Sequence, residues 1–281
     1  MSLVILTLTW QAEDKLKKLK ESLMPALKGI DYKWIIKDNA SSDNTVNMVK
    51  DWGNNIHVVP YKNNLQNFSE GMNYIFNEAA PDDDDMILCL NNDIIINDNK
   101  SISKMISIMD KDSSVGVVGA KLTYTNTDKL QHAGVVFNTM NHIPMHFKAK
   151  KQIDTDSCKN RLFQVVTGAV LLTKAKYYKN VCHSNKSGNK GMDESYHWAF
   201  DDVDMCLAIN KNMDRKVVYC GETDIFHEES ASLKKNPANR LFMQHNMNLL
   251  INKWHHRYII DKNYYDKDPK YNLYFEESKK T

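Results

Sequence analysis

Two short acidic motifs hold the residue types in this chain that are best suited to chemistry. The first, Asn91-Asn92-Asp93, breaks off between two apolar runs, and its carboxylate and amide oxygens are the ligands that hard divalent cations prefer. The second, Asp201-Asp202-Val203-Asp204, opens a helical pattern. Capping the helix requires only one of its carboxylates. The motif therefore also offers a general base, provided that an acceptor hydroxyl lies beside it.

Further polar residues follow apolar runs that are typical of buried strands. In parallel α/β sheets, ligands bind where the carboxyl ends of the strands meet. Turn chemistry explains any one such residue, because Asn and Asp favour loops. Together with the first acidic motif they indicate a ligand site at one sheet edge, and they are Thr7, Thr9, Asp38, Asn39, Asn63 and Asn64. The acidic run 82–85 precedes its strand, so we expect a solvated loop at the opposite edge.

One histidine is placed where it could extend a metal site. His227 follows the acidic helix and a further predicted strand, so it could supply a metal ligand from a third element. A structural role is the more common one for a lone histidine. We expect the remaining histidines, which include His142 and His146 in the polar segment 138–160, to be surface or packing residues.

The elements that position these residues alternate between strand and helix. The predicted strands of the first half are residues 3–8, 34–36, 56–59, 86–90 and 115–118, and the predicted helices are residues 16–27, 71–80 and 101–109. This alternation predicts a mostly parallel sheet covered by helices, and hence an α/β fold. The second half is less regular, with a hairpin over 121–137, strands over 164–173 and 217–220, a helix from Val203 and a long helix over 237–260.

Composition narrows the class of protein without naming a function. The 281 residues, 42% apolar and 26% charged, are typical of a soluble globular protein of one large domain or two small ones. A net charge of +2 gives no electrostatic case for binding nucleic acid. Five cysteines without metal-ligand or redox spacing favour a reducing compartment. No apolar stretch approaches the roughly 20 residues that span a bilayer, so we predict a cytoplasmic protein.

Six segments, taken in order, resemble glycosyltransferase family 2, and in particular its rhamnosyltransferase-like branch. They are residues 36–43 (IKDNASSD), 90–93 (LNND), 130–134 (LQHAG), 166–169 (VTGA), 200–207 (FDDVDMCL) and 227–230 (HEES). Each is short, but all six occur in the order of the family, and the resemblance covers residues 3–250. It implies the GT-A fold, an α/β architecture whose nucleotide-binding, mostly parallel sheet is flanked by helices and followed by a less regular C-terminal acceptor half.

The resemblance divides the chain into a catalytic domain and an extension. Residues 1–250 would form the GT-A glycosyltransferase domain, with the nucleotide-sugar-binding half in residues 1–120 and the acceptor and catalytic half in residues 121–235. Residues 236–281 would form a C-terminal helical extension. We expect the segments 138–160 and 186–198 to shape the acceptor pocket.

The resemblance also implies a role for each motif. Residues expected to contact the nucleoside of the donor are Thr7, Thr9, Asp38 and Asn64. The first acidic motif matches the metal-binding triplet of the family, which places Asn91 and Asn92 beside the donor and makes Asp93 the expected ligand to Mg²⁺ or Mn²⁺. His227 matches a histidine near the metal and the diphosphate. In the second motif Asp202 is the expected catalytic base, paired with Asp201. Many relatives carry Asp where this chain has Asn91, so we expect a lower metal affinity.

These roles imply a metal-dependent, inverting transfer of a hexosyl or deoxyhexosyl group from a nucleotide sugar to a hydroxyl. The reaction needs a base on the acceptor hydroxyl and charge stabilisation on the departing diphosphate, which a divalent metal supplies. Two alternatives stay open at this point. A glycoside hydrolase also uses two carboxylates, but it needs neither nucleotide nor metal. A non-catalytic module that binds nucleotide sugars or glycans could retain the same fold.

The implied donor is a UDP-, GDP- or dTDP-sugar, and the implied acceptor is a glycan, a lipid-linked molecule or a protein, as in polysaccharide biosynthesis. No nucleic-acid partner is expected. The C-terminal segment, with Trp254 and Tyr258 among lysines, is most simply a packed helix with a solvated end. A peripheral contact with the inner face of a membrane, or a homodimer contact, stays open for this segment.

Overall fold

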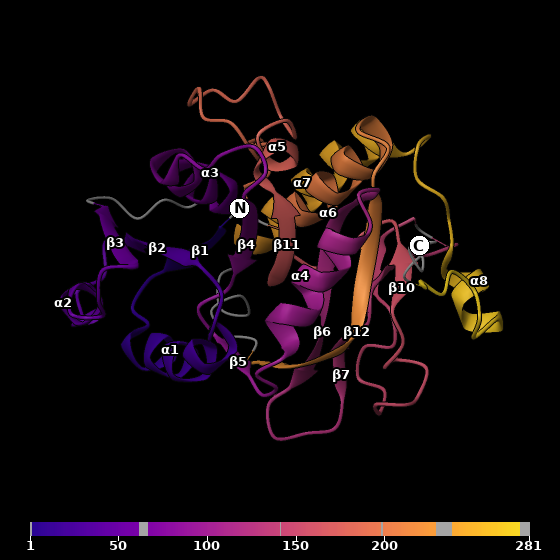
Figure 1. Ribbon diagram of the computed structural model, residues 1–281. Coiled ribbons are helices and arrows are strands. Elements are labelled where there is room, and N and C mark those ends of the chain that lie inside the picture. The colour runs from indigo at the N-terminus through magenta and orange to yellow at the C-terminus, as the bar shows by residue number, and fades with distance from the viewer. Residues whose placement is uncertain (1, 62–66, 141, 198, 229–237, 276–281) are drawn as a thin grey trace.

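The chain folds around a long sheet that carries helices on both faces (Figure 1). The computed structural model describes residues 2–61, 67–140, 142–197, 199–228 and 238–275. The helices are α1 Glu13–Ala26, α2 Thr45–Lys50, α3 Phe68–Ala79, α4 Ser101–Lys111, α5 Ala175–Tyr178, α6 Asp201–Leu207, a π-helical turn η1 Ala208–Asn212, α7 Ala238–Trp254 and α8 Lys262–Lys267. The strands are β1 Leu3–Thr9, β2 Tyr32–Asn39, β3 Ile56–Tyr61, β4 Met86–Leu90, β5 Ile94–Ile96, β6 Val115–Tyr124, β7 Leu130–His132, β8 Val135–Phe137, β9 Pro144–His146, β10 Arg161–Phe163, β11 Val170–Lys174 and β12 Lys216–His227.

The described strands of the main sheet follow the order β10-β12-β6-β11-β4-β1-β2-β3, with β5 paired to β12 and β7 paired to β6. The half of the sheet from β4 to β3 is parallel. The other half mixes directions, because β11 is antiparallel to both β4 and β6 while β6 is parallel to β12. Strands β8 and β9 form a separate antiparallel pair. The predicted α/β architecture, with a central, mostly parallel sheet between helices, is confirmed.

Strand β1 shows why helices cover both faces of this sheet. Its side chains alternate between two buried clusters, with Leu3 and Ile5 in one and Val4 and Leu6 in the other. The first cluster also takes apolar residues from α1, α2 and α4, and the second from α3, α5, α6 and α7. A strand that is apolar on both faces fits only a sheet that is covered on both sides. Figure 1 shows α3 and α5 on one side of β1 and α1 on the other.

Several predicted strands are wrong in their extent: the strands predicted over 34–36 and 115–118 are longer, as β2 and β6 show, and two others differ more. Residues 164–173 do not form one strand, because β10 ends at Phe163, β11 begins at Val170, and Val165 between them bridges to Val135. The strand predicted over 217–220 is the start of β12, which is 12 residues long. The pairing of β12 with β6 has a register shift between Cys220 and Ile225, and β12 continues on the other side of the residues 221–224. The predicted hairpin over 121–137 is also split, because β7 pairs with β6 and β8 with β9.

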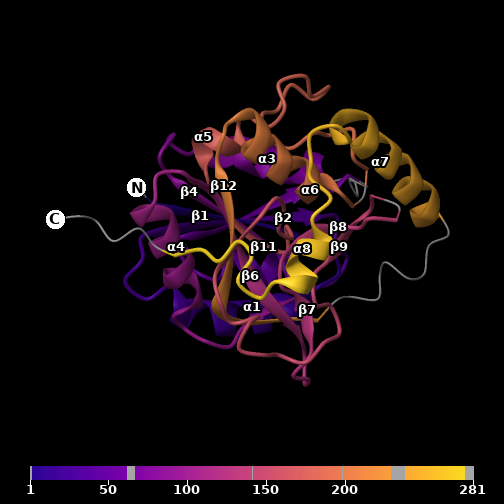
Figure 2. The same ribbon diagram turned by 90° about the vertical axis from the view of Figure 1, so that its right-hand side faces the viewer.

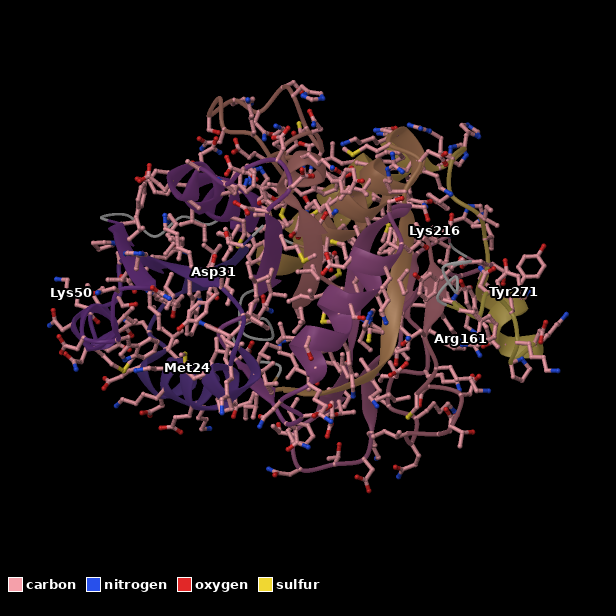
Figure 3. All side chains as sticks on the ribbon, in the orientation of Figure 1. Met24, Asp31, Lys50, Arg161, Lys216 and Tyr271 are labelled. Carbon is pink, nitrogen blue, oxygen red and sulfur yellow. The ribbon has the colours of Figure 1, made fainter. Side chains whose placement is uncertain are left out.

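The C-terminal segment is fastened to the edge of the sheet by a buried arginine. Arg161 on β10 pairs with Asp156 and donates from Nη1 to the carbonyl oxygen of Tyr271 at 2.6 Å (Figure 3). The segment continues past β10 to the end of α4, where Tyr274 Oη donates to Asp112 Oδ2 at 3.2 Å (Figure 2). This extension is therefore packed on the domain rather than separate from it.

Candidate active site

A sharp turn presents the second acidic motif. Ala199 and Phe200 both have left-handed backbone angles, with φ of 63° and 67°, and α6 starts directly after them. Left-handed angles are uncommon for residues with a side chain, and they occur where the surrounding structure enforces them. Asn246 of α7 helps to stabilise this turn, because its Nδ2 donates to the carbonyl oxygen of Ala199 at 2.9 Å. The turn places Asp201 and Asp202 at the start of α6.

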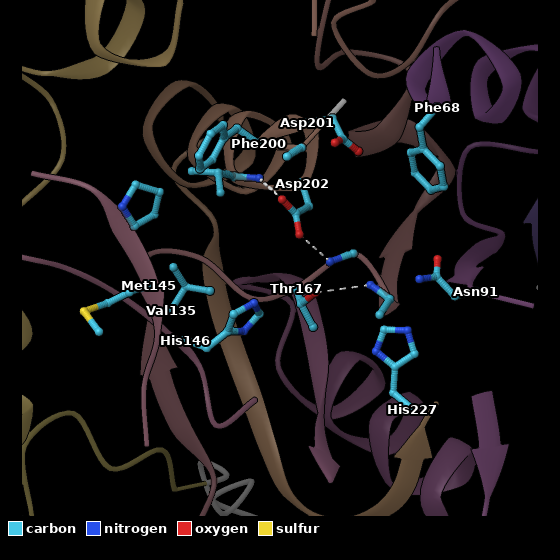
Figure 4. A pocket seen from close by; sticks show the side chains of 15 residues that line it. Phe68, Asn91, Val135, Met145, His146, Thr167, Phe200, Asp201, Asp202 and His227 are labelled. Carbon is cyan, nitrogen blue, oxygen red and sulfur yellow. Dashed lines mark hydrogen bonds between the residues drawn. The ribbon is translucent and has the colours of Figure 1, made fainter. Parts of the chain in front are cut away.

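Two backbone groups hold the Asp202 carboxylate. Oδ2 accepts a hydrogen bond from the N–H of Gly168 at 2.8 Å, and Oδ1 accepts one from the N–H of Val203 at 2.8 Å (Figure 4). Gly168 belongs to the segment between β10 and β11, so two distant parts of the chain fix one carboxylate. Asp202 is only half-buried, which leaves it accessible from the cavity that it lines.

The neighbouring Asp201 differs in its environment. Its side chain is buried, and burial raises the pKa of its carboxyl, with the nearby Asp202 charge raising it further. Burial also raises the pKa of Asp204, which is held by Tyr196, Lys253 and Trp254 instead of facing the cavity. The three carboxylates of the motif thus differ in their surroundings: those of Asp201 and Asp204 are buried, and that of Asp202 is half-buried.

Asp93 and His227 meet where β5 pairs with β12. His227 is the last residue of β12 and lies opposite Ile94 in the register, which brings its Nε2 to 3.1 Å from Asp93 Oδ1. On the other side of the ring, His227 Nδ1 lies 2.7 Å from Gln131 Oε1. Gln131 Oε1 can only accept, so Nδ1 carries a proton and donates to it, while Nε2 faces the Asp93 carboxylate. A carboxylate oxygen and an imidazole nitrogen are both ligands of divalent cations, and here they lie close enough to bind the same ion.

A group of three or more His, Cys, Asp or Glu side chains arranged to hold a metal ion does not occur among the residues that the structure describes. The protein would thus supply two ligands from Asp93 and His227. Mg²⁺ sites commonly use one or two carboxylates and complete their coordination with phosphate oxygens and water. The two side chains fit a metal that is shared with a diphosphate.

The four residues expected to contact the nucleoside differ in their surroundings. Asp38 is 1% exposed, and its Oδ2 accepts from the N–H of Ser41 at 2.9 Å, whereas its buried Oδ1 has no hydrogen-bond partner among the described residues. Thr9 accepts a hydrogen bond from Asn92 Nδ2 at 3.2 Å, which joins the ends of β1 and β4. Thr7 lies in the core, where its hydroxyl accepts from Trp34 Nε1 at 3.0 Å. Asn64 lies outside the described residues.

The site residues surround one cavity of about 360 Å³, the central cavity (Figure 4). Its lining includes Asn91, His146, Thr167, Asp201, Asp202 and His227. The structure therefore brings Asn91 of the first acidic motif, two carboxylates of the second acidic motif and His227 to one place. By contrast, the acidic run 82–85 forms salt bridges with lysines at 176 and 179, far from this cavity in the sheet, as predicted for a solvated loop.

Sequence reasoning missed several residues of the site. Gln131 and His132 belong to the LQHAG segment, which supported the resemblance but received no role of its own. Gly168 belongs to the VTGA segment and holds Asp202. His146 was expected to be a surface or packing residue within the segment 138–160, and it is exposed and also lines the central cavity. Gln131, His132 and Gly168 could have been found from the sequence, because they belong to segments that resemble the family.

Solved structures with a similar fold include those of S. aureus TarS. The crystal structure of TarS 1-349 matches with a TM-score of 0.55 and 13% identity, covering 88% of this chain and 66% of that chain. The crystal structure of TarS matches at 0.58 and 14%, covering 95% of this chain and 42% of that one. TarS 1-349 in complex with UDP-GlcNAc matches at 0.58 and 13%, covering 95% and 70%. This chain thus spans less than half of TarS.

Sequence comparison adds the family. No curated protein matches the sequence. No helix among the described residues is both long and apolar enough to cross a membrane. The family model described as glycosyl transferase family 2 matches residues 4–181, which is most of the chain and includes the first acidic motif, the LQHAG segment and Gly168. The chain belongs to glycosyl transferase family 2.

Proposed function

We propose that this protein is a metal-dependent, inverting glycosyltransferase that moves a sugar from a nucleotide-sugar donor to a hydroxyl of an acceptor. The observation that carries the proposal is the setting of Asp202. Two backbone N–H groups fix this carboxylate in a cavity that also contains Asn91 and His227. A base and a diphosphate site are the two things that an inverting transfer requires.

Asp202 would act on the acceptor. In the proposed step its carboxylate takes the proton of an acceptor hydroxyl while the hydroxyl oxygen attacks the anomeric carbon of the donor. The bond from that carbon to the diphosphate oxygen breaks, and the nucleoside diphosphate leaves from the opposite face. One displacement of this kind inverts the anomeric configuration. Because backbone groups orient the carboxylate, it needs no rearrangement before the proton is transferred.

Asp93 and His227 would hold the metal, Mg²⁺ or Mn²⁺. The 3.1 Å separation of Asp93 Oδ1 and His227 Nε2 supports this assignment, and Gln131 would orient the histidine. When bound, the metal stabilises negative charge on the phosphate oxygens of the donor. Asn91 and Asn92 would contribute neutral oxygens or N–H groups at the same sheet edge. Because these amides carry no charge, they would not repel the diphosphate of the nucleotide sugar.

The donor nucleoside would bind at the ends of β1 and β2. The buried Asp38 Oδ1 supports this location, because a buried carboxylate oxygen with no partner among the described residues is suited to accept from a ligand. TarS 1-349 has been crystallised with UDP and with UDP-GlcNAc, which makes UDP-sugars the first donors to test. GDP-, dTDP- and CMP-linked donors complete the panel.

The test is transfer by the wild type and by Asp202→Asn. Each donor is supplied with Mn²⁺ and a set of p-nitrophenyl mono- and disaccharides as probe acceptors. We expect the wild type to form product of inverted configuration, and Asp202→Asn to bind UDP normally in calorimetry while transfer falls by on the order of 10³-fold or more. Transfer at the wild-type rate by Asp202→Asn would overturn the role of Asp202.

The same assay addresses the two alternatives. Release of sugar from an oligosaccharide without nucleotide or metal would indicate a glycoside hydrolase. Binding of UDP without turnover on any donor, including slow hydrolysis by water, would indicate a non-catalytic module. Membership of family 2 and the position of Asp202 both favour transfer over these alternatives.

A further inference from the structure

Two histidines beside the central cavity have no part in the chemistry proposed above. His132, the last residue of β7, is fully buried, and His146, the last residue of β9, is exposed and lines the cavity. Their Nδ1 atoms lie 2.8 Å apart. Two ring nitrogens at this distance need one proton between them, so one ring donates and the other accepts.

The surroundings of His132 determine which ring donates. The backbone N–H groups of Gly134 and Thr167 point at His132 Nε2, at 3.3 Å and 3.4 Å. A backbone N–H can only donate, so Nε2 must be the nitrogen with the lone pair. Burial lowers the pKa of His132 well below its usual value, and the ring is neutral. Its single proton is therefore on Nδ1 and is donated to Nδ1 of His146.

This bond also determines the form of His146. Because its Nδ1 accepts from His132, the hydrogen of the His146 ring is on Nε2, where it can only be donated. Figure 4 shows the His146 ring reaching from β9 toward Thr167, below the Asp202 carboxylate. His146 and Met145 also border a second cavity of about 510 Å³, so the ring lies between two hollows of the surface. A base therefore lies on one side of the central cavity and an obligate donor on another.

We propose that His146 is an acceptor-binding residue whose Nε2–H donates a hydrogen bond to an oxygen of the acceptor glycan, in the tautomer that His132 imposes. His132 is then a positioning residue that acts only through His146. The proposal rests on the proposed function, since it assumes that an acceptor binds beside Asp202. It assigns to His146 a second contact with that acceptor. The expected ligand is a glycan, which is rich in hydroxyl and ring oxygens. It would extend beyond the sugar unit whose hydroxyl lies beside Asp202.

The histidine pair can be tested without any enzymatic assay. Long-range ¹H–¹⁵N spectra of protein labelled with ¹⁵N-histidine distinguish the two neutral tautomers, and the variants His132→Gln and His146→Gln assign the signals. We expect the Nδ1–H pattern for His132 and the Nε2–H pattern for His146. An Nε2–H pattern for His132, or a charged His146 at neutral pH, would overturn the proposal whether or not the protein transfers sugar.

Kinetics with the best p-nitrophenyl acceptor test the binding role. His146→Phe keeps a flat ring but loses the donor, and we expect kcat/KM for the acceptor to fall about tenfold while KM for the donor sugar is unchanged. His146→Gln restores an N–H at a similar reach and should recover most of this loss. The matched control His57→Phe changes an exposed histidine of β3 and should have no effect. An unchanged acceptor KM in His146→Phe would overturn the role.

His132→Gln separates positioning from simple packing. Its amide oxygen can still accept from Gly134 and Thr167, but nothing replaces the Nδ1–H that faces His146. We expect its melting temperature to stay near that of the wild type while the His146 signal changes to a mixture of tautomers and the acceptor KM rises. A wild-type tautomer of His146 in this variant contradicts the proposal. Failure of the wild type to transfer to any probe would overturn the proposed function and the binding role together, with the tautomer spectra unaffected.

Discussion

Asp202 lies so close to the segment before β11 that residue 168 needs to be glycine. A Cβ at Gly168 would lie 3.0 Å from Asp202 Cβ, while the Gly168 N–H holds Oδ2 of the same carboxylate. Gly168→Ala should therefore displace the carboxylate by a few tenths of an ångström. We expect kcat for transfer to fall about tenfold, because a misplacement of about 1 Å costs about 10²-fold. Steady-state kinetics measure the loss, and calorimetry with UDP should show unchanged binding.

The control for this variant is a glycine that is free of contacts. No heavy atom lies within 4 Å of a Cβ added at Gly188, although its φ of 76° is positive and that of Gly168 is not. Gly188→Ala adds the same methyl group away from the central cavity, so it should leave kcat unchanged even if the strained backbone lowers the melting temperature. Equal losses of kcat in both variants would show that the methyl group acts through general stability and not through Asp202.

The buried Asp201 should make stability depend on pH. Burial raises the pKa of its carboxyl in the folded protein above the value of 3.8 that applies when the group is exposed. The unfolded chain therefore loses this proton first, and folding becomes less favourable as the pH rises above 3.8 toward the folded pKa. Asp201→Asn removes the ionisable group.

We expect Asp201→Asn to melt at a higher temperature than the wild type at about pH 8, with a gain of roughly 1–3 kcal/mol that shrinks toward about pH 5. Thermal melts across this pH range measure the difference. Asp202→Asn serves as the comparison, because its carboxylate is half-buried and hydrogen-bonded by backbone groups. A difference between Asp201→Asn and the wild type that stays constant with pH would contradict the assignment of a raised pKa.

The residue types of the site were predictable from the sequence, whereas their partners were not. Asp93 and Asp202 stand out because carboxylates interrupt apolar patterns there. The role of Gln131 depends on His227, which is 96 positions away in the chain. The family resemblance implies that Thr7 contacts the nucleoside, whereas its bond to the indole of Trp34 on the neighbouring strand could not be read from the sequence. Such pairings depend on the register of strands, which spacing alone does not specify.

At the scale of elements, α7 supports helix α6, which carries Asp202. Trp254 Nε1 donates to the buried Asp204 Oδ1 at 2.6 Å, and Lys253 forms an ion pair with the same carboxylate. Trp254→Phe removes one donor from a buried carboxylate, which should cost about 1–3 kcal/mol of unfolding free energy. Because α6 also carries Asp202, we expect kcat to fall as well. Urea denaturation and steady-state kinetics measure the two effects.

Trp52→Phe is the matched control for this prediction. Trp52 is a partly buried tryptophan that packs against Trp34 on the opposite face of the sheet, with ring centroids 5.8 Å apart. The same truncation there should cost packing alone, with kcat unchanged. If Trp254→Phe behaves like Trp52→Phe in both measurements, then α7 merely covers the sheet and does not position α6.

The extent of the elements shows what sequence patterns can predict. Strand β4 has the predicted bounds, because its five residues are all apolar and turns flank it. Strand β12 was recognised only in its first third, because the polar residues 221–224 interrupt the apolar pattern that a strand usually shows. The structure continues the strand through a register shift at that point. This continuation brings His227 to Asp93, so the same irregularity hid the contact between these two residues.

At the scale of the whole molecule, the central cavity joins two parts of the chain that sequence comparison treats differently. The family model ends at residue 181, before both Asp202 and His227. The long strand β12 and the turn before α6 nevertheless carry these two residues back to Asn91 at the end of β4. The family model thus covers the part of the cavity lining that comes before residue 181, whereas Asp202 and His227 come from segments beyond its end.

The whole molecule carries a net charge of only +2, so it offers little general attraction to a nucleoside diphosphate. The affinity for UDP should instead come from the metal held by Asp93 and His227. We expect calorimetry to show much weaker UDP binding in EDTA than in Mn²⁺. Gln131→Leu should reduce Mn²⁺ affinity by about 10–100-fold, because the histidine loses the partner that orients it. Lys18→Met is the control, since it removes only the exposed ion pair between Lys18 and Glu228 beside the site. UDP binding that is equally tight in EDTA would show that the protein neutralises the diphosphate without a metal.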